Sequence, residues 1–254
     1  MTPDLASSHP TSRFSDRVEN YVKYRPSYPR EIIPFLESHL QLSPDKRIVD
    51  VGSGTGIFSE LFLKNGYRVT GIEPNQNMRR AAETKLHDYP GFTSRNRQAE
   101  RTGLKSHSAD LITVAQAFHW MEPIQTKKEF FRILKPGGHI VLAWNLRLRH
   151  SPFLQDYQDL KKKFGIDYKE NKQVDEQAIQ CFFQPLPMAI HCFPNVQWLD
   201  FDSLKGQLLS AYYIPLPGHQ SYNTMINELI HLFIAYNENG FIRMEFETKL
   251  YISQ

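Results

Sequence analysis

The glycine-rich segment Asp50-Val51-Gly52-Ser53-Gly54-Thr55-Gly56 constrains the fold of this chain more than any other stretch. It follows the apolar run 47–51 directly and precedes a pattern of apolar residues at helical spacing over 57–62. Glycines at alternate positions after a buried strand let the backbone approach a ligand, and the turn presents the N-terminus of the next helix. The segment therefore predicts a strand, a ligand-binding loop and a helix. A tight connection without a ligand is the alternative.

The region 46–145 alternates short apolar runs with longer helical patterns, which is typical of a parallel sheet covered by helices. Strands are expected at 47–51, 67–73, 92–97, 110–117 and 139–144, with helices after the first, second and fourth. The last of these helices starts at Pro123, where a first turn tolerates proline, and its expected buried face comprises Ile124, Phe130, Phe131 and Leu134. Residues 135–138, Lys-Pro-Gly-Gly, predict a compact turn before the fifth strand.

Beyond residue 145 the pattern changes. Apolar residues three and four apart predict a helix over 153–164, and the run Lys161-Lys162-Lys163 is expected to be its solvated end. A sixth strand is expected at 195–201 and a last helix around 226–233. Residues 242–252 alternate apolar and polar side chains, which predicts a strand with one solvated face, as in an antiparallel pair.

Composition excludes several classes of protein. The 254 residues carry 30 Lys and Arg against 27 Asp and Glu, and the resulting charge of +3 is too small and dispersed to indicate a nucleic-acid-binding protein. No apolar run approaches the roughly 18 residues that span a membrane, and residues 1–12 have no signal-peptide core and are expected to be disordered. Cys181 and Cys192 fit neither a disulfide framework nor a metal-site spacing with His191, so both are expected in the core. We expect a cytoplasmic protein without a metal.

Glu73 lies 21 positions after Gly52, at the end of the second expected strand. This spacing suits a carboxylate that accepts hydrogen bonds from a ribose diol, so an adenosine-containing ligand is indicated. A dinucleotide motif would need glycine at position 57, where Ile57 stands. With no diphosphate to bind, Asp50 could face the amino end of an amino-acid tail, which favours S-adenosylmethionine. A nicotinamide-dependent dehydrogenase remains the alternative.

Three motifs resemble those of the class I S-adenosylmethionine-dependent methyltransferases. Segment 50–56 resembles their first motif, Gly71-Ile72-Glu73-Pro74 the second, and Leu134-Lys135-Pro136-Gly137-Gly138 the turn before their fifth strand. The resemblance implies an α/β, Rossmann-like fold with a seven-stranded, mostly parallel sheet, an antiparallel last strand and helices on both faces. It also implies one domain over 13–254, with a cofactor-binding core at 45–145, a helical insertion at 146–194 and closing strands and helices at 195–254.

Within that family, residues 24–29, 116–120, 203–206 and 213–219 are similar to the small-molecule methyltransferases that include the trans-aconitate and cantharidin enzymes. The family's cofactor contacts, carried over by position, fall on Asp50, Gly52, Ser53, Gly54, Thr55, Gly56, Glu73, Pro74, Met78, Ala99, Glu100, Gln116, Ala117, Tyr21 and Arg25. The glycine loop would meet the methionine part, Asp50 its amino group and Glu73 the ribose. The 99–100 loop would recognise adenine largely through backbone groups, because Gln98 replaces an aspartate of many relatives.

The acceptor pocket is expected at the carboxyl edge of the fourth strand, where ligands of open α/β sheets bind. Its expected residues are Phe118, His119, Trp120, Tyr28 and Arg147. His119 could act as a base, because its ordinary pKa is about 6.5, or position the loop, or have no direct role. Packing is the alternative for Phe118. Arg25 and Arg147 could meet a carboxylate, and the cluster from Tyr21 to Tyr28 could be a flap over the cofactor or a surface helix.

These residues predict in-line methyl transfer from S-adenosylmethionine to a small acceptor, with carboxylates among the candidates and S-adenosylhomocysteine as the product. Alignment of the two reactants and exclusion of water would supply most of the acceleration. A catalytically silent cofactor-binding protein is the main alternative, and a protein or RNA methyltransferase is disfavoured by the mild charge. The sequence leaves monomer and homodimer equally open.

Overall fold

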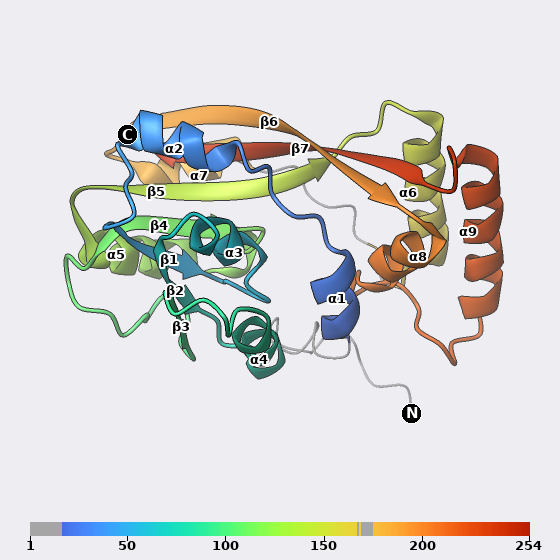
Figure 1. Cartoon of the computed structure of the whole chain (residues 1–254), viewed down its shortest axis with the longest axis horizontal. Helices are drawn as coiled ribbons and strands as arrows, with labels where there is room; N and C mark the ends of the chain where they lie inside the picture. Colours follow the sequence, from blue (N-terminus) through green and yellow to red (C-terminus); the bar gives the residue numbers. More distant parts are fainter. Residues whose placement is uncertain (1–16, 167, 169–174) are drawn as a thin grey trace.

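A seven-stranded sheet in the order β3-β2-β1-β4-β5-β7-β6 organises the part of the chain that the computed structural model describes, residues 17–166, 168 and 175–254 (Figure 1). The expected tail at 1–12 lies outside the described residues. The strands are β1 (Arg47–Val51), β2 (Arg68–Ile72), β3 (Phe92–Arg95), β4 (Ala109–Ala115), β5 (Leu134–Arg147), β6 (Met188–Leu199) and β7 (Ile242–Ser253). Pairs from β3 to β5 are parallel, and β7 is antiparallel to both β5 and β6. The expected Rossmann-like fold class is confirmed.

Helices cover both faces of this sheet. They are α1 (Val18–Tyr24), α2 (Ile32–Leu40), α3 (Ile57–Leu63), α4 (Gln76–Lys85), α5 (Pro123–Ile133), α6 (Pro152–Phe164), α7 (Glu176–Phe183), α8 (Phe201–Leu209) and α9 (Tyr222–Tyr236). α2 and α3 lie on one face, and α5 and α7 lie on the other (Figure 1). Because successive strand residues point to opposite faces, Val141 packs in the first layer and Leu142 in the second.

The long strands β5, β6 and β7 extend past the rest of the sheet into a helical cap, formed by α6, α8 and α9 (Figure 1). A third apolar cluster fills this cap, with Phe153 and Leu160 from α6, Leu204 from α8 and Leu229 from α9. We call the remainder, β1–β5 with α2–α5 and α7, the core lobe. α1 contacts α4 of the core lobe and α8 of the cap, so it bridges the two parts.

Three side chains that were expected in the core are exposed. Ile124 is 66% exposed, because the buried face of α5 is set by Thr126, Phe130 and Ile133, and Ile124 lies about 200° round the helix from Thr126. Both cysteines are exposed: Cys181 lies on α7 and Cys192 on the outer side of the edge strand β6. The prediction that these three side chains lie in the core is wrong.

Two further expectations beyond residue 145 need correction. Lys161 is only 4% exposed, because it lies four residues after Tyr157 on the buried face of α6; only Lys162 and Lys163 are exposed, as expected of the run. β6 begins at Met188, so it occupies part of the 146–194 segment in which only helices were expected. Pro194 interrupts the strand pattern there, and the edge position of β6 tolerates it.

Candidate functional site

The loop after β1 is fixed to the end of β2 by backbone hydrogen bonds. The N–H groups of Gly52 and Ser53 donate to the carbonyl oxygen of Ile72 at 2.8 and 3.2 Å. Gly52 has a φ of +69°, and a Cβ on it would lie 2.5 Å from the Cβ of Ala117, so only glycine allows this contact with the loop after β4. Gly54 has a φ of +55°, and a Cβ on it would meet no heavy atom within 4 Å. The backbone at Gly54 therefore faces open space.

Glu73 closes this loop from the end of β2. Its Oε2 accepts a hydrogen bond from the N–H of Gly54 at 2.9 Å, and its Oε1 accepts one from the N–H of Asn75 at 2.7 Å. Burial raises the pKa of Glu73, while the two N–H groups favour the charged form. A carboxylate has acceptor capacity beyond two hydrogen bonds. Glu73 is therefore held beside the open space with lone pairs left for a ligand.

Asp50 lies beneath the loop and is fully buried. Its two carboxylate oxygens accept hydrogen bonds from the hydroxyls of Ser59 at 2.6 Å and Thr113 at 2.9 Å. Burial raises the pKa of Asp50 to about 6, although the hydroxyls oppose that shift. The group is thus predominantly charged at pH 7 and places negative charge under the glycine loop.

Thr55 carries a polar atom without a partner. Its Oγ1 is buried and forms no hydrogen bond to any described residue. Such orphaned hydroxyls are uncommon in folded proteins and often mark a ligand or water position. The orphan lies one residue from the open space at Gly54, so the loop fits a polar ligand such as S-adenosylmethionine.

The expected adenine contacts come from two buried positions. Met78 on α4 and Ala99 after β3 are 5% and 7% exposed, and Pro74 is partly buried. The Oε1 of Glu100 accepts a hydrogen bond from the N–H of Glu122 at 2.9 Å, so this carboxylate is directed at the start of α5. Recognition of adenine through the backbone of residues 99–100 stays a prediction.

The loop after β4 adopts an uncommon backbone conformation. Gln116 has a φ of +58°, and its N–H and side-chain Nε2 donate to the carbonyl oxygens of Ala143 and Asn145 at 2.9 and 3.2 Å. Non-glycine residues in this conformation concentrate at functional sites. A 3-10 helix, Phe118–Trp120, follows directly.

The three aromatic residues of this 3-10 helix separate into different environments. Phe118 is half-buried, and its ring centroid lies 4.7 Å from that of Phe182 on α7, which fits the packing alternative for Phe118. Trp120 points toward the cap, with its ring 6.4 Å from that of Tyr212. His119 lies at the surface beside Trp120, with ring centroids 4.7 Å apart, and desolvation lowers its pKa.

α1 is held on the cap. A Cβ on Gly206 of α8 would overlap the ring of Tyr24, so only glycine allows this packing. Arg17 donates to the carbonyl oxygens of Leu209 and Ile214 at 2.8 and 2.6 Å, and Arg25 donates to that of Ser210 at 3.3 Å. The next segment reaches the core lobe, where the ring of Tyr28 lies 4.5 Å from that of Phe58.

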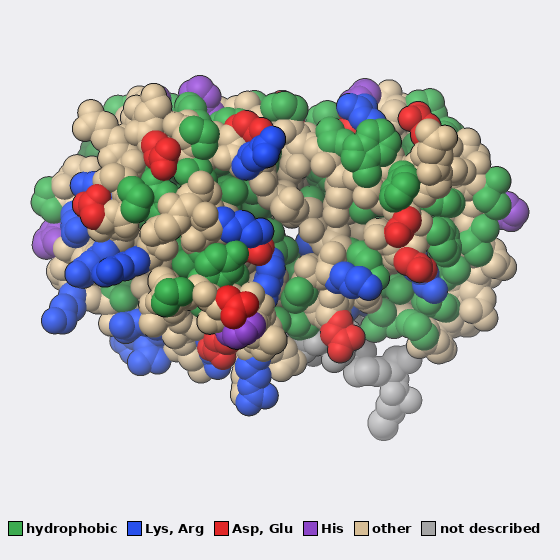
Figure 2. Space-filling view, in the orientation of Figure 1, with side chains coloured by type: hydrophobic (Ala, Val, Ile, Leu, Met, Phe, Trp, Pro, Cys, Tyr) green, Lys and Arg blue, Asp and Glu red, His purple; other side chains and the backbone are tan. Residues whose placement is uncertain are grey.

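An opening is visible in this region. In Figure 2 it lies between the end of β4 and α1, on the face drawn in Figure 1. The carboxyl ends of β1 and β4 point toward it from the core lobe, and the residues that follow α1 lie on its cap side (Figure 1). α1 lies on the other side of the opening from the ends of these strands (Figure 1), and the flap formed by Tyr21 to Tyr28 stays a prediction.

Sequence reasoning assigned no role to Gln207 and Gly206, which contact Tyr24 of α1, and it placed the buried Lys161 in solvent. Lys161 follows Tyr157 by four residues on an apolar helical pattern, a spacing that could have indicated its burial. Gln207 is 4% exposed and accepts a hydrogen bond from Arg147 at 3.2 Å. No comparable signal exists for Gly206, because its role depends on a helix far away in the sequence.

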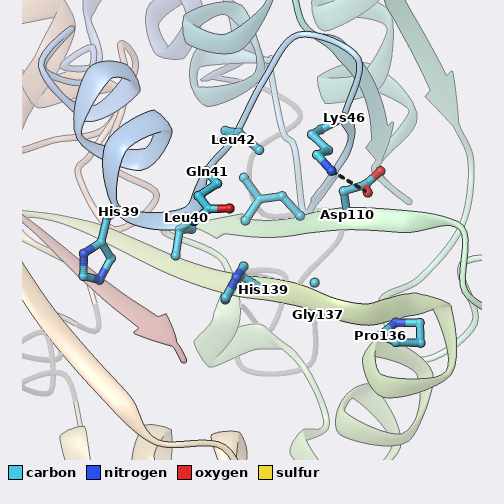
Figure 3. Close-up of a pocket in the computed structure, with 11 residues that line it drawn as sticks. His39, Leu40, Gln41, Leu42, Lys46, Asp110, Pro136, Gly137 and His139 are labelled. Carbon is cyan, nitrogen blue, oxygen red and sulfur yellow. Dashed lines mark ion pairs between the residues drawn. The ribbon is translucent and has the colours of Figure 1, made fainter.

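A separate cavity lies at the amino ends of the central strands, where β1 and β4 begin (Figure 3). Its volume is about 330 Å³, and Lys46 and Asp110 form an ion pair at 4.0 Å in its wall. It is remote from the glycine loop, at the other end of the strands. Among the described residues, no group of three or more potential metal ligands occurs, and no helix has the length and apolarity to cross a membrane.

Comparison with known proteins assigns the family. Residues 49–142 match the model of a methyltransferase domain. A Dictyostelium discoideum protein assigned to the methyltransferases is 30% identical over 188 residues, 69% of each chain. An uncharacterized methyltransferase of Mycobacterium tuberculosis is 34% identical over 163 residues, and the match spans 64% of each chain.

Solved structures agree on the fold. A protein of Anaeromyxobacter dehalogenans described as a type II methyltransferase superposes with a TM-score of 0.63 at 20% identity, covering 91% of this chain and 96% of that one. The sheet has the seven strands and the antiparallel last strand that the resemblance implied. Together with the sequence relatives, these findings show that the chain belongs to the class I S-adenosylmethionine-dependent methyltransferases.

Proposed function

We propose that this protein transfers a methyl group from S-adenosylmethionine to a small-molecule acceptor held between the core lobe and the cap. The observation that carries the proposal is the open space at Gly54, bordered by the Glu73 carboxylate and the orphaned hydroxyl of Thr55. S-adenosylmethionine, when bound, supplies an electrophilic methyl group on a sulfonium. The residues of the chain then have to bind the cofactor and the acceptor, orient them and exclude water from the site.

The core lobe would provide the cofactor contacts. Glu73 has acceptor capacity left for the ribose hydroxyls, and its hydrogen bonds from Gly54 and Asn75 fix its orientation. Asp50 would attract the amino group through the loop, because it is predominantly charged above pH 6. Met78 and Ala99 would border the adenine. The contact between Gly52 and Ala117 would close the base of the site against water.

Trp120 and His119 would face the acceptor. The Trp120 ring points toward Tyr212 and would form the pocket wall between the lobes, where an aromatic face also attracts a cation. His119 is neutral at pH 7, since its pKa lies below the ordinary value. We assign His119 a positioning role beside Trp120. A carboxylate acceptor is already ionised and needs no base, whereas a hydroxyl acceptor would lose its proton to a neutral imidazole.

Cofactor identity is tested by isothermal titration. S-adenosylmethionine and S-adenosylhomocysteine should bind and NADH should not. Glu73→Gln should weaken the binding of S-adenosylmethionine and of S-adenosylhomocysteine by roughly 10- to 100-fold, because a charge-assisted hydrogen bond to the ribose is lost. The control is Glu83→Gln on the exposed side of α4, which should leave affinity unchanged. Binding of NADH without heat from S-adenosylmethionine would overturn the proposal.

Transfer itself is tested with methyl-labelled cofactor and a panel of small acids, phenols and amines. Label in any of these acceptors supports the enzyme. Cofactor binding with no label in any member of the panel instead favours a silent cofactor-binding protein.

A further inference from the structure

The turn between β3 and β4 presents two backbone N–H groups that have no acceptor in the described part of the chain. Residues 98–101 form a tight turn, in which the N–H of Arg101 donates to the carbonyl oxygen of Gln98 at 3.1 Å. The N–H groups of Ala99 and Glu100, at the centre of this turn, donate to none of the described residues. Ala99 is only 7% exposed, so little water reaches it. Backbone N–H groups in such surroundings normally have a partner, which a ligand can supply.

The turn lies next to the proposed ribose contact. The N–H of Glu73 donates to the carbonyl oxygen of Arg95 at 3.1 Å, so the segment that leaves β3 starts beside Glu73. On the other side, the Oε1 of Glu100 accepts the N–H of Glu122 at 2.9 Å and the hydroxyl of Thr126 at 3.5 Å. The turn therefore lies between the end of β2 and the start of α5, at the carboxyl ends of the strands.

Glu129, on the buried face of α5, fixes the chain directly after this turn. Glu129 is 8% exposed, and its Oε1 accepts hydrogen bonds from both the N–H and the hydroxyl of Thr102, at 2.8 and 2.5 Å. Thr102 is fully buried, and its hydroxyl oxygen accepts the N–H of Leu104 at 3.3 Å. One carboxylate of α5 thus holds the backbone two residues beyond Glu100.

Arg132 orients the carboxylate of Glu129 and extends the network. Its Nε donates to Oε2 of Glu129 at 2.7 Å, and one terminal nitrogen donates to Oε1 at 2.8 Å, which is the two-point geometry of arginine with a carboxylate. The same nitrogen donates to the carbonyl oxygen of Leu104 at 2.8 Å, and the other donates to the hydroxyl of Ser106 at 3.2 Å. Burial opposes ionisation of Glu129, but the hydrogen bonds from Arg132 and Thr102 outweigh it and lower its pKa. Glu129 is therefore charged at neutral pH.

The direction of the two N–H groups depends on these attachments. The backbone of Ala99 and Glu100 forms no hydrogen bond with any described residue, so the turn is oriented by the residues on either side of it. Thr102 is the first residue after the turn whose backbone is anchored to another element. Hydrogen bonds weaken steeply with misalignment, and a displacement of about 1 Å in a site costs roughly 100-fold.

We propose that Glu129 is a positioning residue for the cofactor: through Thr102 it fixes the turn at 98–101, so that an N–H of Ala99 or Glu100 donates to N1 of adenine. The assignment rests on the proposed function, because it concerns the cofactor of that site. Glu129 itself touches no ligand in this arrangement, but it sets the preference for adenine over other purines. N1 of adenine accepts a hydrogen bond, whereas N1 of hypoxanthine carries a proton and donates.

The experiment compares S-adenosylhomocysteine with S-inosylhomocysteine, which differs from it only at the edge of the base, by calorimetry on the full chain. The wild-type chain should bind S-adenosylhomocysteine roughly tenfold or more tightly, because the proton on N1 of hypoxanthine opposes the N–H groups of the turn. Glu129→Ala should weaken S-adenosylhomocysteine roughly tenfold and S-inosylhomocysteine much less, so that most of the preference is lost. Thr102→Val keeps the pair of Glu129 with Arg132 and should reduce the preference in the same direction. It decides the matter if Glu129→Ala does not fold.

Asp110→Ala is the matched control. Asp110 also accepts hydrogen bonds from a basic side chain, Lys135 at 2.7 Å, and from a backbone N–H, that of Arg47 at 2.9 Å. It lies at the amino ends of the strands, away from the turn at 98–101. Asp110→Ala should lower the melting temperature, as Glu129→Ala does, and leave the preference for adenine unchanged.

Hydrogen exchange in the free protein shows whether the turn has been released. The amides of Thr102 and Leu104 should exchange faster in Glu129→Ala than in the wild-type chain and in Asp110→Ala. An undiminished preference for adenine in Glu129→Ala and Thr102→Val would overturn the proposal and leave Glu129 a structural residue. Equal affinity of the wild-type chain for the two nucleosides would overturn it as well. Failure of the wild-type chain to bind either nucleoside would instead contradict the proposed function, and the positioning role with it.

Discussion

The core lobe and the cap differ in how their buried charged side chains are held. On the core side, the carboxylates of Asp50 and Glu73 each accept two hydrogen bonds from the protein, so their positions are fixed. On the cap side, the Nε atoms of Arg25 and Arg147 are buried without a hydrogen-bond partner among the described residues, and the Nζ of Lys161 lies over the ring of Tyr157. The difference shows that the carboxylates of the core lobe are preformed by backbone and hydroxyl groups, whereas these N–H groups beside the cap have no partner among the described residues.

The largest expected effect concerns the preformed half. Gly52→Ala places a methyl group against Ala117 in a backbone conformation that disfavours alanine, so we expect the free energy of unfolding to fall by about 2 to 6 kcal/mol. Urea unfolding measures this loss. Calorimetry with S-adenosylhomocysteine should show no binding in the variant.

Gly54→Ala is the matched substitution in the same loop. Its φ is also positive, which costs about 1 to 2 kcal/mol, but its new methyl group meets only open space. We therefore expect little loss of stability beyond that cost and a clear loss of cofactor affinity. Equal destabilisation by the two substitutions would show that the loop is not preformed around a ligand space.

The charge beneath the loop gives the next effect. In the folded chain Asp50 has a pKa of about 6 against an ordinary 3.8, so the folded state retains a proton that the unfolded state has lost, and stability falls as pH rises from about 4 to 6. Asp50→Asn should remove this loss of folding stability, which amounts to about 2 to 3 kcal/mol at pH 7. Denaturant unfolding of both proteins at pH 4.5 and 7 measures the difference.

Asp110→Asn is a control of opposite sign. Lys135 and Lys46 lower the pKa of Asp110, so its contribution to stability is present above its ordinary pKa and is lost on acidification. The charge of Asp50 should also govern binding: cofactor affinity should decline below pH 6 in the wild-type chain, where Asp50 is protonated, and not in Asp50→Asn. A wild-type affinity that is flat from pH 5 to 7 would contradict the role given to Asp50.

The packing of α1 on α8 gives the smallest expected effect. Gly206→Ala should displace α1 from α8, because the new methyl group overlaps the ring of Tyr24, at a cost of about 1 to 3 kcal/mol. Hydrogen exchange of the amides in α1 should become faster. Asp202→Ala, on the exposed side of α8, should leave it unchanged, and Tyr24→Leu combined with Gly206→Ala should restore protection.

Sequence patterns anticipated the strands of the core lobe well, because most of them are short apolar runs that alternate with helical patterns. The cap was harder to predict. Lys161 was assigned to solvent because charge outweighed its spacing from Tyr157, and β6 was shortened at its start because Pro194 breaks the strand pattern. Arg147 and Lys161 belong to different elements, and only the tertiary fold brings both to the ring of Tyr157.

The placement of β7 has a consequence for how the chain reaches this fold. β7 lies between β5 and β6 and pairs with both over most of its length, so β6 has no partner strand until β7 has been synthesised. The core lobe can form its parallel pairs earlier, whereas the cap waits for contacts that span more than a hundred residues. Pairings of such long sequence separation form slowly. During synthesis on the ribosome, the core lobe should therefore form first and the cap last.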